Sequence, residues 1–358
     1  MIKNEGIMAD RLPKKIVAID LFCGAGGLTR GMLDAGIDVI GGFDIAKDAA
    51  YAYEYNNIRA NGQRCRYLNQ DVATVTVSQI NELIAGRKGK SFLLAGCAPC
   101  QPFSSQNRNK SPFDDRKNLL LQFARLVQET SPDFVFMENV PGLPRLAPDV
   151  LNFFIDTLRK NNMSCIDFGV VNAKWYGVPQ NRRRFVLVAS KQNIQIPSPV
   201  YSTNSQFQTV RDAISRFPRL EAGEINSRIP NHRCASLSAV NLRRISLIKY
   251  NRKELPEELV LPCHKRTCSH GDTYGRMTWD SPAPTLTTKF FSISNGRYGH
   301  PEQNRAISLR EGASIQTFPA NYVFSGSMQS IARQIGNAVP PLLAKNIVKA
   351  FITNGEKK

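Results

Sequence analysis

Short apolar runs alternate with stretches of helical periodicity through the first half of the chain, and this rhythm constrains the fold most. Each apolar run is bounded by Gly, Pro or Asp, as is typical of parallel strands covered on both faces. The predicted strands span residues 15–22, 39–45, 91–97, 134–140 and 185–190. Helical patterns occupy 28–35, 46–59, 77–87, 118–129 and 150–158. This alternation predicts βαβ units and an α/β fold with a doubly wound, mostly parallel sheet.

The alternation stops near Lys191. From there to about residue 297 the chain holds scattered Pro, Ser, Asn and Arg with few periodic runs. A helical pattern returns at 342–351, after two prolines, and this last helix is expected to rejoin the first domain. We therefore expect one domain from 1–190 plus 328–358, and a second, smaller and irregular domain over 191–327.

The charge balance points to an acidic partner. The chain of 358 residues has a net charge of +18, and residues 191–300 hold 16 basic against 8 acidic side chains. The excess is spread out rather than run together, unlike a disordered basic tail. Nucleic acid is the foremost candidate partner. No apolar run is long enough to span a membrane, and residues 1–11 lack the apolar segment of a secretory signal, so we expect a cytoplasmic protein.

A glycine-rich segment, DLFCGAGG at residues 20–27, directly follows the first predicted strand. Gly24, Gly26 and Gly27 would let the backbone turn tightly and approach a ligand closely. The carboxyl end of a parallel strand is the usual ligand position in such sheets. Thr29 stands where a dinucleotide fingerprint needs its third glycine, which favours a nucleoside cofactor without a pyrophosphate and disfavours a nicotinamide oxidoreductase. A purely structural turn is the alternative.

Two carboxylates follow the next strands. Asp44 ends the second strand, and Asp71 comes after a short third strand that lies before the run 91–97 and is given no bounds. Asp44 is placed to accept hydrogen bonds from ribose hydroxyls, and Asp71 one from an adenine amine. Helix N-caps are the alternative for each carboxylate.

The segment GCAPCQPFS at 96–104 follows the fourth strand and contains a C-x-x-C pair, Cys97 and Cys100. Such a pair can be redox-active or half of a zinc site. No second C-x-x-C exists to complete a zinc ribbon, and two prolines with Phe103 form a rigid turn around Cys100. We therefore interpret Cys100 as a nucleophile.

The fifth strand ends in Glu138, a candidate proton donor or anchor in the same crevice. The segment QNRRR at 180–184 leads into an apolar strand. Because its arginines adjoin buried sequence, at least one is expected to point inward and pair with a carboxylate.

These motifs together resemble the C5-cytosine-specific DNA methyltransferase family of the bacterial restriction-modification type. They occur in the family's order along nearly the whole chain. They are DLFCGAGG (20–27), GCAPCQPFS (96–104), ENV (138–140), QNRRR (180–184), RAISLRE (305–311) with QTFP (316–319), and GNAVP (336–340). The resemblance implies a Rossmann-like catalytic domain, dependent on S-adenosylmethionine, with a target-recognition domain in the basic region.

The resemblance also implies roles for the catalytic residues. Cys100 adds to C6 of cytosine, and Glu138 holds or protonates N3. Arg182 and Arg184 contact the base and support the glutamate. S-adenosylmethionine then methylates C5 of a cytosine flipped out of a short, specific double-stranded DNA sequence. The implied cofactor contacts are Phe22, Gly24, Gly26, Gly27, Asp44, Asp71, Pro99, Leu119 and Asn337.

Further expectations concern the loop and the recognition domain. Residues 101–117 resemble the family's active-site loop, which closes on the flipped base. The Arg and Lys side chains of 191–300 should divide between phosphate and guanine contacts, and residues 285–288 resemble a family feature near that domain's end. The family needs no metal, and the spacing of a possible zinc set is unusual, so we expect none. That set is Cys263, His264, Cys268 and His270. Trp175 and Trp279 are expected in the core.

Two other functions remain open. An RNA (tRNA) cytosine methyltransferase would use the same chemistry, but that branch of the family usually carries a Cys-Phe-Thr tripeptide, which is absent here. A catalytically inactive DNA-binding relative would have no reason to keep Cys100, Glu138, Arg182 and Arg184 together. We expect a monomer acting on double-stranded DNA, with any cognate restriction endonuclease acting separately.

Overall fold

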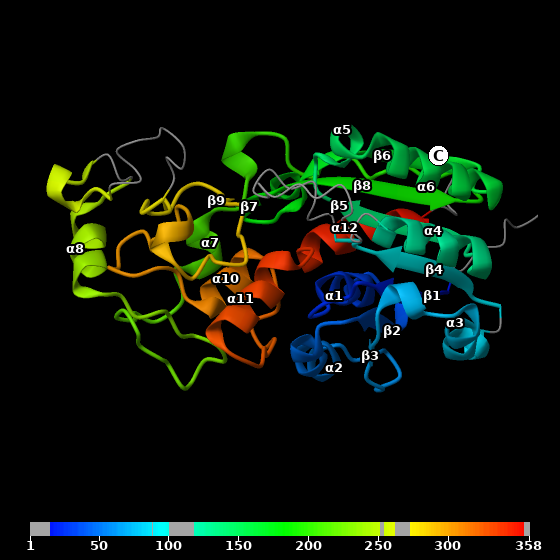
Figure 1. Cartoon of the computed structure of the whole chain (residues 1–358), viewed down its shortest axis with the longest axis horizontal. Coiled ribbons are helices and arrows are strands. Elements are labelled where there is room, and N and C mark those ends of the chain that lie inside the picture. Colours follow the sequence, from blue (N-terminus) through cyan, green and yellow to red (C-terminus); the bar gives the residue numbers. More distant parts are fainter. Residues whose placement is uncertain (1–14, 88, 100–117, 251–253, 262–272, 354–358) are drawn as a thin grey trace, which may run out of the picture.

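The centre of the molecule is a seven-stranded sheet with the strand order β3-β2-β1-β4-β5-β8-β6 (Figure 1). The computed structural model describes residues 15–87, 89–99, 118–250, 254–261 and 273–353. Strands β1 to β5 run parallel, and β8 is antiparallel to both neighbours, β5 and β6. The strands are β1 (Ile16–Leu21), β2 (Asp38–Asp44), β3 (Arg66–Asn69), β4 (Ser91–Gly96), β5 (Phe134–Asn139), β6 (Cys165–Asn172) and β8 (Arg183–Ser190).

Helices cover both faces of the sheet, which confirms the doubly wound α/β prediction. One apolar core lies beneath α3, α4 and α6, and a second lies beneath α1, α2 and α12. The helices of this part are α1 (Gly27–Asp34), α2 (Ala50–Asn56), α3 (Val77–Ile84), α4 (Asn118–Thr130), α5 (Leu143–Leu146), α6 (Pro148–Lys160) and α12 (Pro341–Thr353). In the part of the chain that the structure describes, no helix has the length and apolarity to cross a bilayer.

Two strands differ from the sequence prediction. The apolar run 185–190 is predicted to be a parallel strand, but it forms most of β8, which is antiparallel. Strand β6 has no counterpart among the predicted strands. It lies at the edge of the sheet and most of its residues are only half-buried, so it lacks the continuous apolar run of a central strand.

The last helix rejoins the first part of the chain, as expected. Its residues Leu343, Ala344 and Ile347 are buried in the same core as Leu28 of α1. The two helices pack closely because Gly31 has no side chain: a Cβ there would lie 2.5 Å from the Cβ of Ala344. Only glycine permits this approach of the two helices.

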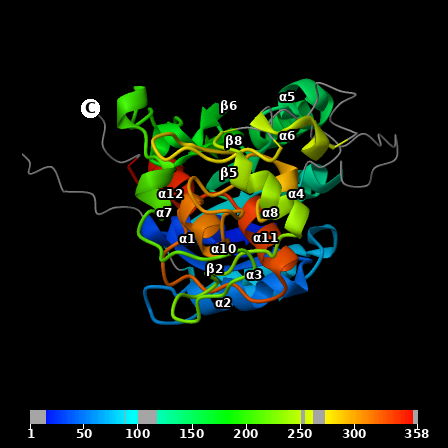
Figure 2. The ribbon, with the colours of Figure 1, turned by 90° about the vertical axis from the view of Figure 1, so that its left-hand side faces the viewer.

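The chain beyond residue 191 forms a second group of elements at the carboxyl ends of the parallel strands (Figures 1 and 2). Much of 191–300 is irregular, as expected. Short elements interrupt it: α7 (Val210–Ile214), α8 (Ala239–Leu247), and a two-residue strand β9 (Ala283–Pro284) paired with β7 (Gln180–Asn181). Single turns of 3-10 helix join several elements.

Two helices of this group, α10 (Leu309–Ile315) and α11 (Met328–Asn337), were missed by the sequence prediction. All seven residues of α10 are buried, so it shows no amphipathic stripe. Both helices pack in one core with α7, and that core also takes in Ala25 and Ala52 from the first half of the chain. The division of the chain into domains at residue 328 remains a proposal.

A buried ion pair organises this second group. Arg305 and Glu311 are both almost fully buried and form a two-pronged contact, with N···O distances of 2.7 and 2.8 Å. Glu311 also completes a capping box with Ser308 at the start of α10. His300 lies beside the pair, with its Nε2 atom 3.9 Å from the Glu311 carboxylate. Burial lowers the pKa of His300 to about 4.

We predict that His300 makes the fold sensitive to acid. The pKa of a histidine in the unfolded chain is about 6.5, whereas that of folded His300 is about 4. The unfolded state therefore binds a proton first as the pH falls, and the free energy of unfolding decreases between pH 6.5 and pH 4. By pH 5 the loss is about 2 kcal/mol. Urea unfolding at pH 7 and pH 5 measures it. His300→Asn keeps an acceptor for the backbone N–H of Glu302 and should remove this part of the pH dependence; an unchanged dependence would contradict the assignment.

Candidate active site

Predicted site residues from five strands lie in a row along one edge of the sheet. The strands follow one another as β3, β2, β1, β4 and β5, and all run in the same direction, so their carboxyl ends meet at that edge. The residues at these ends are Asp71, Asp44, Phe22, Pro99 and Glu138. The topology therefore places the expected cofactor side next to the expected catalytic side.

Glu138 and Arg184 form an ion pair at the end of β5. The Arg184 Nε atom lies 2.9 Å from Glu138 Oε1, and only about a tenth of the carboxylate side chain is exposed. Burial raises the pKa of Glu138, while Arg184, Arg182 and a hydrogen bond from the Cys97 thiol act in the opposite direction. The prediction that an arginine of QNRRR turns inward to pair with a carboxylate is confirmed.

Arg182 makes contacts of a different kind. It is buried, and its guanidinium donates to the carbonyls of Leu286 (3.0 Å), Gly336 (2.9 Å) and Ala338 (3.2 Å). In the described part of the chain Arg184 alone pairs with Glu138, and the Nε atom of Arg182 has no hydrogen-bond partner. Arg182 therefore fixes the backbone on both sides of Asn337, and it acts on Glu138 through its charge without forming an ion pair with it.

Two glutamines extend this network. The Gln180 amide donates to Gln316 Oε1 (2.8 Å), and Gln316 donates in turn to the carbonyl of Ile335 (2.7 Å). Gln180 Oε1 accepts from the backbone N–H of Leu286 (3.0 Å). Both glutamines lie within sequence motifs, but neither was predicted to have a role of its own. They join β7, the end of α10 and the end of α11 in a buried region where unpaired amides would be costly.

The conformation of the glycine loop, residues 20–27, is set mainly by other segments of the same chain that pack against it. Phe22, Gly24 and Gly26 all adopt positive φ values (58°, 48° and 87°). A Cβ on Gly26 would lie 2.3 Å from the Asn57 amide, and one on Gly27 would lie 2.4 Å from the carbonyl of Val339. Other segments of the chain fill the Cβ positions of these two glycines, so packing alone already requires glycine at both; their contact with a cofactor stays a prediction. Gly24 has open space around it and fits the ligand interpretation.

Asp44 and Asp71 both bind local backbone N–H groups. Asp44 accepts from Gly24 and Ala46, each at 2.8 Å, and burial raises its pKa. Asp71 accepts from Ala73 at 2.9 Å and caps a 3-10 turn. The helix N-cap alternative thus holds for Asp71, whereas the Asp44 carboxylate joins the end of β2 to the glycine loop at Gly24. A carboxylate has about four acceptor positions, so each keeps capacity for a ligand.

Asp20 is a buried carboxyl group to which the sequence prediction gave no role. The Thr29 hydroxyl donates to it at 2.6 Å and lies 3.0 Å from the Tyr53 hydroxyl. Burial raises the pKa of Asp20 to about 7. Thr29 was the indication in the sequence. It stands where a dinucleotide fingerprint has a glycine, and its hydroxyl is the group that binds Asp20.

The predicted nucleophile, Cys100, lies outside the described residues, as do the expected loop 101–117 and the four possible zinc ligands. Ala98, two residues before Cys100, is held to the end of β5 because Asn139 donates to its carbonyl at 3.1 Å. Pro99 is exposed and Leu119, near the start of α4, is half-buried. Across the ranges that the structure describes, no three His, Cys, Asp or Glu side chains form a metal site.

The expectation that the Arg and Lys side chains of 191–300 contact phosphates or guanines is wrong for Arg276. It is buried, and its guanidinium donates to the carbonyls of Ile248 and His300, both at 2.7 Å, and of Ile245 at 2.8 Å. It therefore supports the fold of this region and is not available to phosphates or guanines. Trp175 and Trp279 are half-buried against apolar cores, as predicted.

Comparison with known proteins assigns the family. Residues 16–353 match the family model "C-5 cytosine-specific DNA methylase". The type II methylase M.HgiDII of Herpetosiphon aurantiacus is 41% identical, over 93% of this chain and 94% of its own length. The type II methyltransferase M1.HphI of Haemophilus parahaemolyticus is 35% identical, over 93% and 86%. The chain belongs to the C-5 cytosine-specific DNA methylase family and is a DNA cytosine-5 methyltransferase whose relatives are of the type II restriction-modification type.

Solved structures show the same fold. A DNA modification methyltransferase encoded within an E. coli prophage matches with a TM-score of 0.70 and 22% identity, covering 94% of this chain and 98% of its own. The S. pombe Dnmt2 methyltransferase matches with a TM-score of 0.64 and 17% identity, covering 96% and 100%. At this level of identity the likeness supports the fold alone.

We predict that Gly27→Ala disturbs the segment carrying Asn337. The new methyl group would meet the Val339 carbonyl at 2.4 Å, and such overpacking costs roughly 1–3 kcal/mol. Urea unfolding and calorimetric titration with S-adenosylmethionine should show lower stability and weaker binding. Gly169→Ala is the matched control, because a Cβ there meets nothing within 4 Å. Equal effects of the two substitutions would contradict the packing argument.

Proposed function

We propose that this methyltransferase transfers a methyl group from S-adenosylmethionine to C5 of a flipped-out cytosine, through a covalent adduct between Cys100 and C6. The observation that carries the proposal is the buried Glu138–Arg184 pair, set beside the segment that leads to Cys100. A buried carboxyl group held by one arginine can both orient a base and transfer a proton.

Glu138 is suited to act on N3 of cytosine. Because burial raises its pKa, the carboxyl group keeps a proton to higher pH than an exposed glutamate. A proton given to N3 withdraws electrons from the ring and favours addition of the Cys100 thiolate to C6. Arg184 holds the carboxylate that remains after the transfer. Its charge also prevents the pKa of Glu138 from rising further.

The bonds balance over one cycle. The sulfur of Cys100 forms a bond to C6, which makes C5 nucleophilic. S-adenosylmethionine, when bound, would supply the electrophilic methyl group that C5 takes up, and S-adenosylhomocysteine would leave. Loss of the C5 proton to solvent restores the C5–C6 double bond and expels Cys100 as the thiolate, and N3 returns its proton to the Glu138 carboxylate.

The residues at the strand ends fit S-adenosylmethionine. Phe22 offers an aromatic ring, and Asp44 and Asp71 offer acceptors for a ribose and an adenine amine. Gly24 leaves open space beside them, and Asn337 is exposed on a segment that Arg182 and Gly27 position. These residues would hold the cofactor at the edge shared with Glu138.

The wider setting completes the proposal. Double-stranded DNA is the substrate of the family, and we propose a specific sequence within it, recognised by residues 191–327. We further propose a monomeric, cytoplasmic modification enzyme with a separately acting endonuclease. Bisulfite sequencing of DNA from cells expressing the chain would reveal the target sequence; the absence of methylated cytosine would contradict the proposal.

We predict that Cys100 becomes covalently trapped on duplex DNA containing 5-fluorocytosine at the target position. Fluorine at C5 cannot leave as a proton does, so the adduct persists and can be detected by denaturing electrophoresis. Cys100→Ser should give no adduct and no methyl transfer. Cys97→Ala is the matched control from the same C-x-x-C pair and should still be trapped. Trapping of the Cys100→Ser protein would contradict the mechanism.

We predict that Glu138→Gln slows methyl transfer by about 10²–10⁴-fold, the usual range for a general acid.

We predict that Arg184→Gln moves the alkaline limb of the pH profile of kcat to higher pH, because the Arg184 charge lowers the pKa of Glu138. Arg183→Gln is the control, since Arg183 is exposed on the same strand. An alkaline limb that stays in place in Arg184→Gln would show that Glu138 does not donate the proton.

A further inference from the structure

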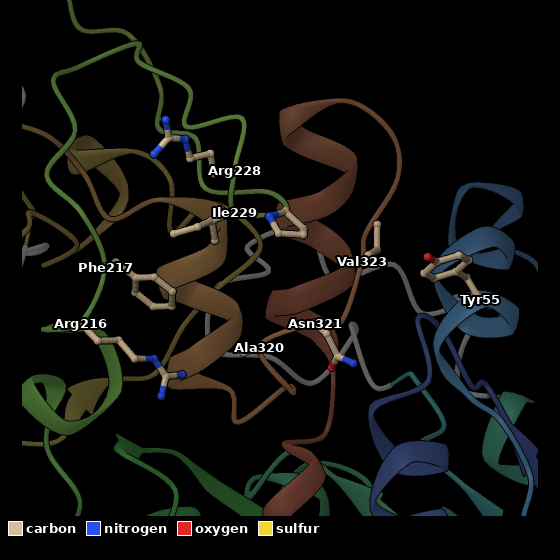
Figure 3. Close-up of a pocket in the computed structure, with 9 residues that line it drawn as sticks. Tyr55, Arg216, Phe217, Arg228, Ile229, Ala320, Asn321 and Val323 are labelled. Carbon is tan, nitrogen blue, oxygen red and sulfur yellow. The ribbon is translucent and has the colours of Figure 1, made fainter.

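A cavity of about 630 Å³ lies between α2 and the second group of elements (Figure 3). Its volume falls within the range of small-molecule sites. The lining comes from α2, from the segment after α7, and from the segment between α10 and α11. The residues are Tyr55, Arg216, Phe217, Arg228, Ile229, Pro230, Ala320, Asn321 and Val323.

The cavity walls are held by hydrogen bonds to the backbone. The Asn56 side chain bonds both the N–H and the carbonyl of Val323, each at 2.8 Å, and so joins α2 to the opposite wall. The buried Arg310 donates to the Pro230 carbonyl at 2.7 Å and also to that of Tyr322. These bonds connect all three lining segments, so the cavity is formed before any ligand binds.

The cavity rim is positively charged. Arg216 and Arg228 are exposed, and neither has a carboxylate partner among the residues that the structure describes. In Figure 3 they lie on the same side of the cavity, with Phe217 between them. None of the lining residues is acidic. Burial lowers the pKa of Arg310 to about 10, and the charge of Arg216 acts in the same direction. An anionic ligand would be favoured here.

Aromatic rings accompany this charge. Tyr55 is 45% exposed and stacks on Tyr51 with ring centroids 5.3 Å apart. Phe217 is half-buried, and the Arg216 guanidinium lies 5.3 Å from its ring centre. Phe217 thus lies beside the two arginines, and Tyr55 offers a second ring across the cavity. Sites for single-stranded nucleic acid combine such rings, on which bases stack, with cations that pair with phosphates.

The cavity is distinct from the catalytic edge. Tyr55 belongs to α2, which follows β2, whereas Glu138 lies on β5. Strands β1 and β4 lie between β2 and β5 in the sheet, a separation of about 14 Å at the usual strand spacing. A base held by Glu138 therefore cannot also occupy this cavity.

We propose that the cavity binds a nucleotide of a single-stranded nucleic acid. Arg216 and Arg228 contact phosphates, Phe217 contacts the base beside them, and Tyr55, on the opposite side of the cavity, contacts a neighbouring base of the same strand. A single strand fits better than a duplex, since only an unstacked base can enter a concave site and meet these rings. The site requires no target cytosine and would act as an accessory contact outside the methylated sequence.

Fluorescence anisotropy with a labelled oligothymidylate tests the proposal, because this strand contains no cytosine. Arg216→Ala with Arg228→Ala should weaken binding at least about tenfold. The same double substitution should reduce the slope of log K against log salt by about 1.4, or about 0.7 for each phosphate that is no longer neutralised.

Tyr55→Ala should weaken binding about tenfold because a stacked base loses its ring, and Tyr55→Phe should restore binding. Arg219→Ala is the matched control, since Arg219 is exposed nearby but pairs with Glu221.

Three results would overturn the proposal. Binding could be unchanged in the double variant, or Arg219→Ala could weaken it as much, which would show diffuse attraction. Alternatively, thymidine monophosphate could displace the labelled strand as well as unlabelled oligothymidylate does, which would identify a free nucleotide as the ligand. Thermal melting should show the variants to be folded, because both arginines are exposed and have no ion-pair partner in the described part of the chain.

Discussion

The buried guanidinium of Arg182 is the contact on which the arrangement of the whole molecule depends. It lies where β7, the segment around Leu286 and the segment 336–338 meet, and donates to carbonyls of the latter two. A buried charge without an ion-pair partner is costly unless it is hydrogen-bonded, and each carbonyl it satisfies would be costly if left alone. Asn337 on the cofactor side is therefore fixed relative to the strand that carries Arg184 on the base side.

The pair of Glu138 and Arg184 shows how position sets chemistry. Removal from water favours the neutral carboxyl group, and the adjacent guanidinium favours the ionised one. Neither influence acts alone, which suits the proton transfer proposed for Glu138. Arg182 and Arg184 lie two residues apart on one chain segment, and the charges of both lower the pKa of Glu138. Only Arg184 forms the ion pair with it, whereas the hydrogen bonds of Arg182 hold the backbone.

Much of the fold could be predicted from the sequence. The central strands and their helices are recognisable because burial on both faces gives continuous apolar runs. Strand β6 and helix α10 were missed for opposite reasons: one is an edge strand with little burial, and the other is buried on every side. Periodicity detects elements with one buried face and one exposed face, or strands covered on both faces. It has no signal for these two cases.

The parts of the site that depend on local sequence could be predicted, and the parts that depend on distant contacts could not. The inward turn of one arginine to a carboxylate followed from an arginine run beside a buried strand, and only the family resemblance implied that the carboxylate is Glu138. The separate task of Arg182, and the packing roles of Gly26 and Gly27, depend on partners distant in the chain, such as Leu286 and Val339. Local sequence carries no information on such distant contacts. Likewise, composition marks 191–300 as basic without revealing that Arg276 is buried.

The packing of α12 on α1 also determines when the enzyme can become competent during synthesis. The glycine loop near residue 25 needs the Tyr322 hydroxyl on the Ala25 carbonyl, the Val339 carbonyl against Gly27, and Ala344 against Gly31. All three come from the last stretch of the chain. A nascent chain on the ribosome thus has its first strand and helix long before their partners emerge. The glycine loop should therefore take its final shape only once residues 322–344 have emerged and packed against it.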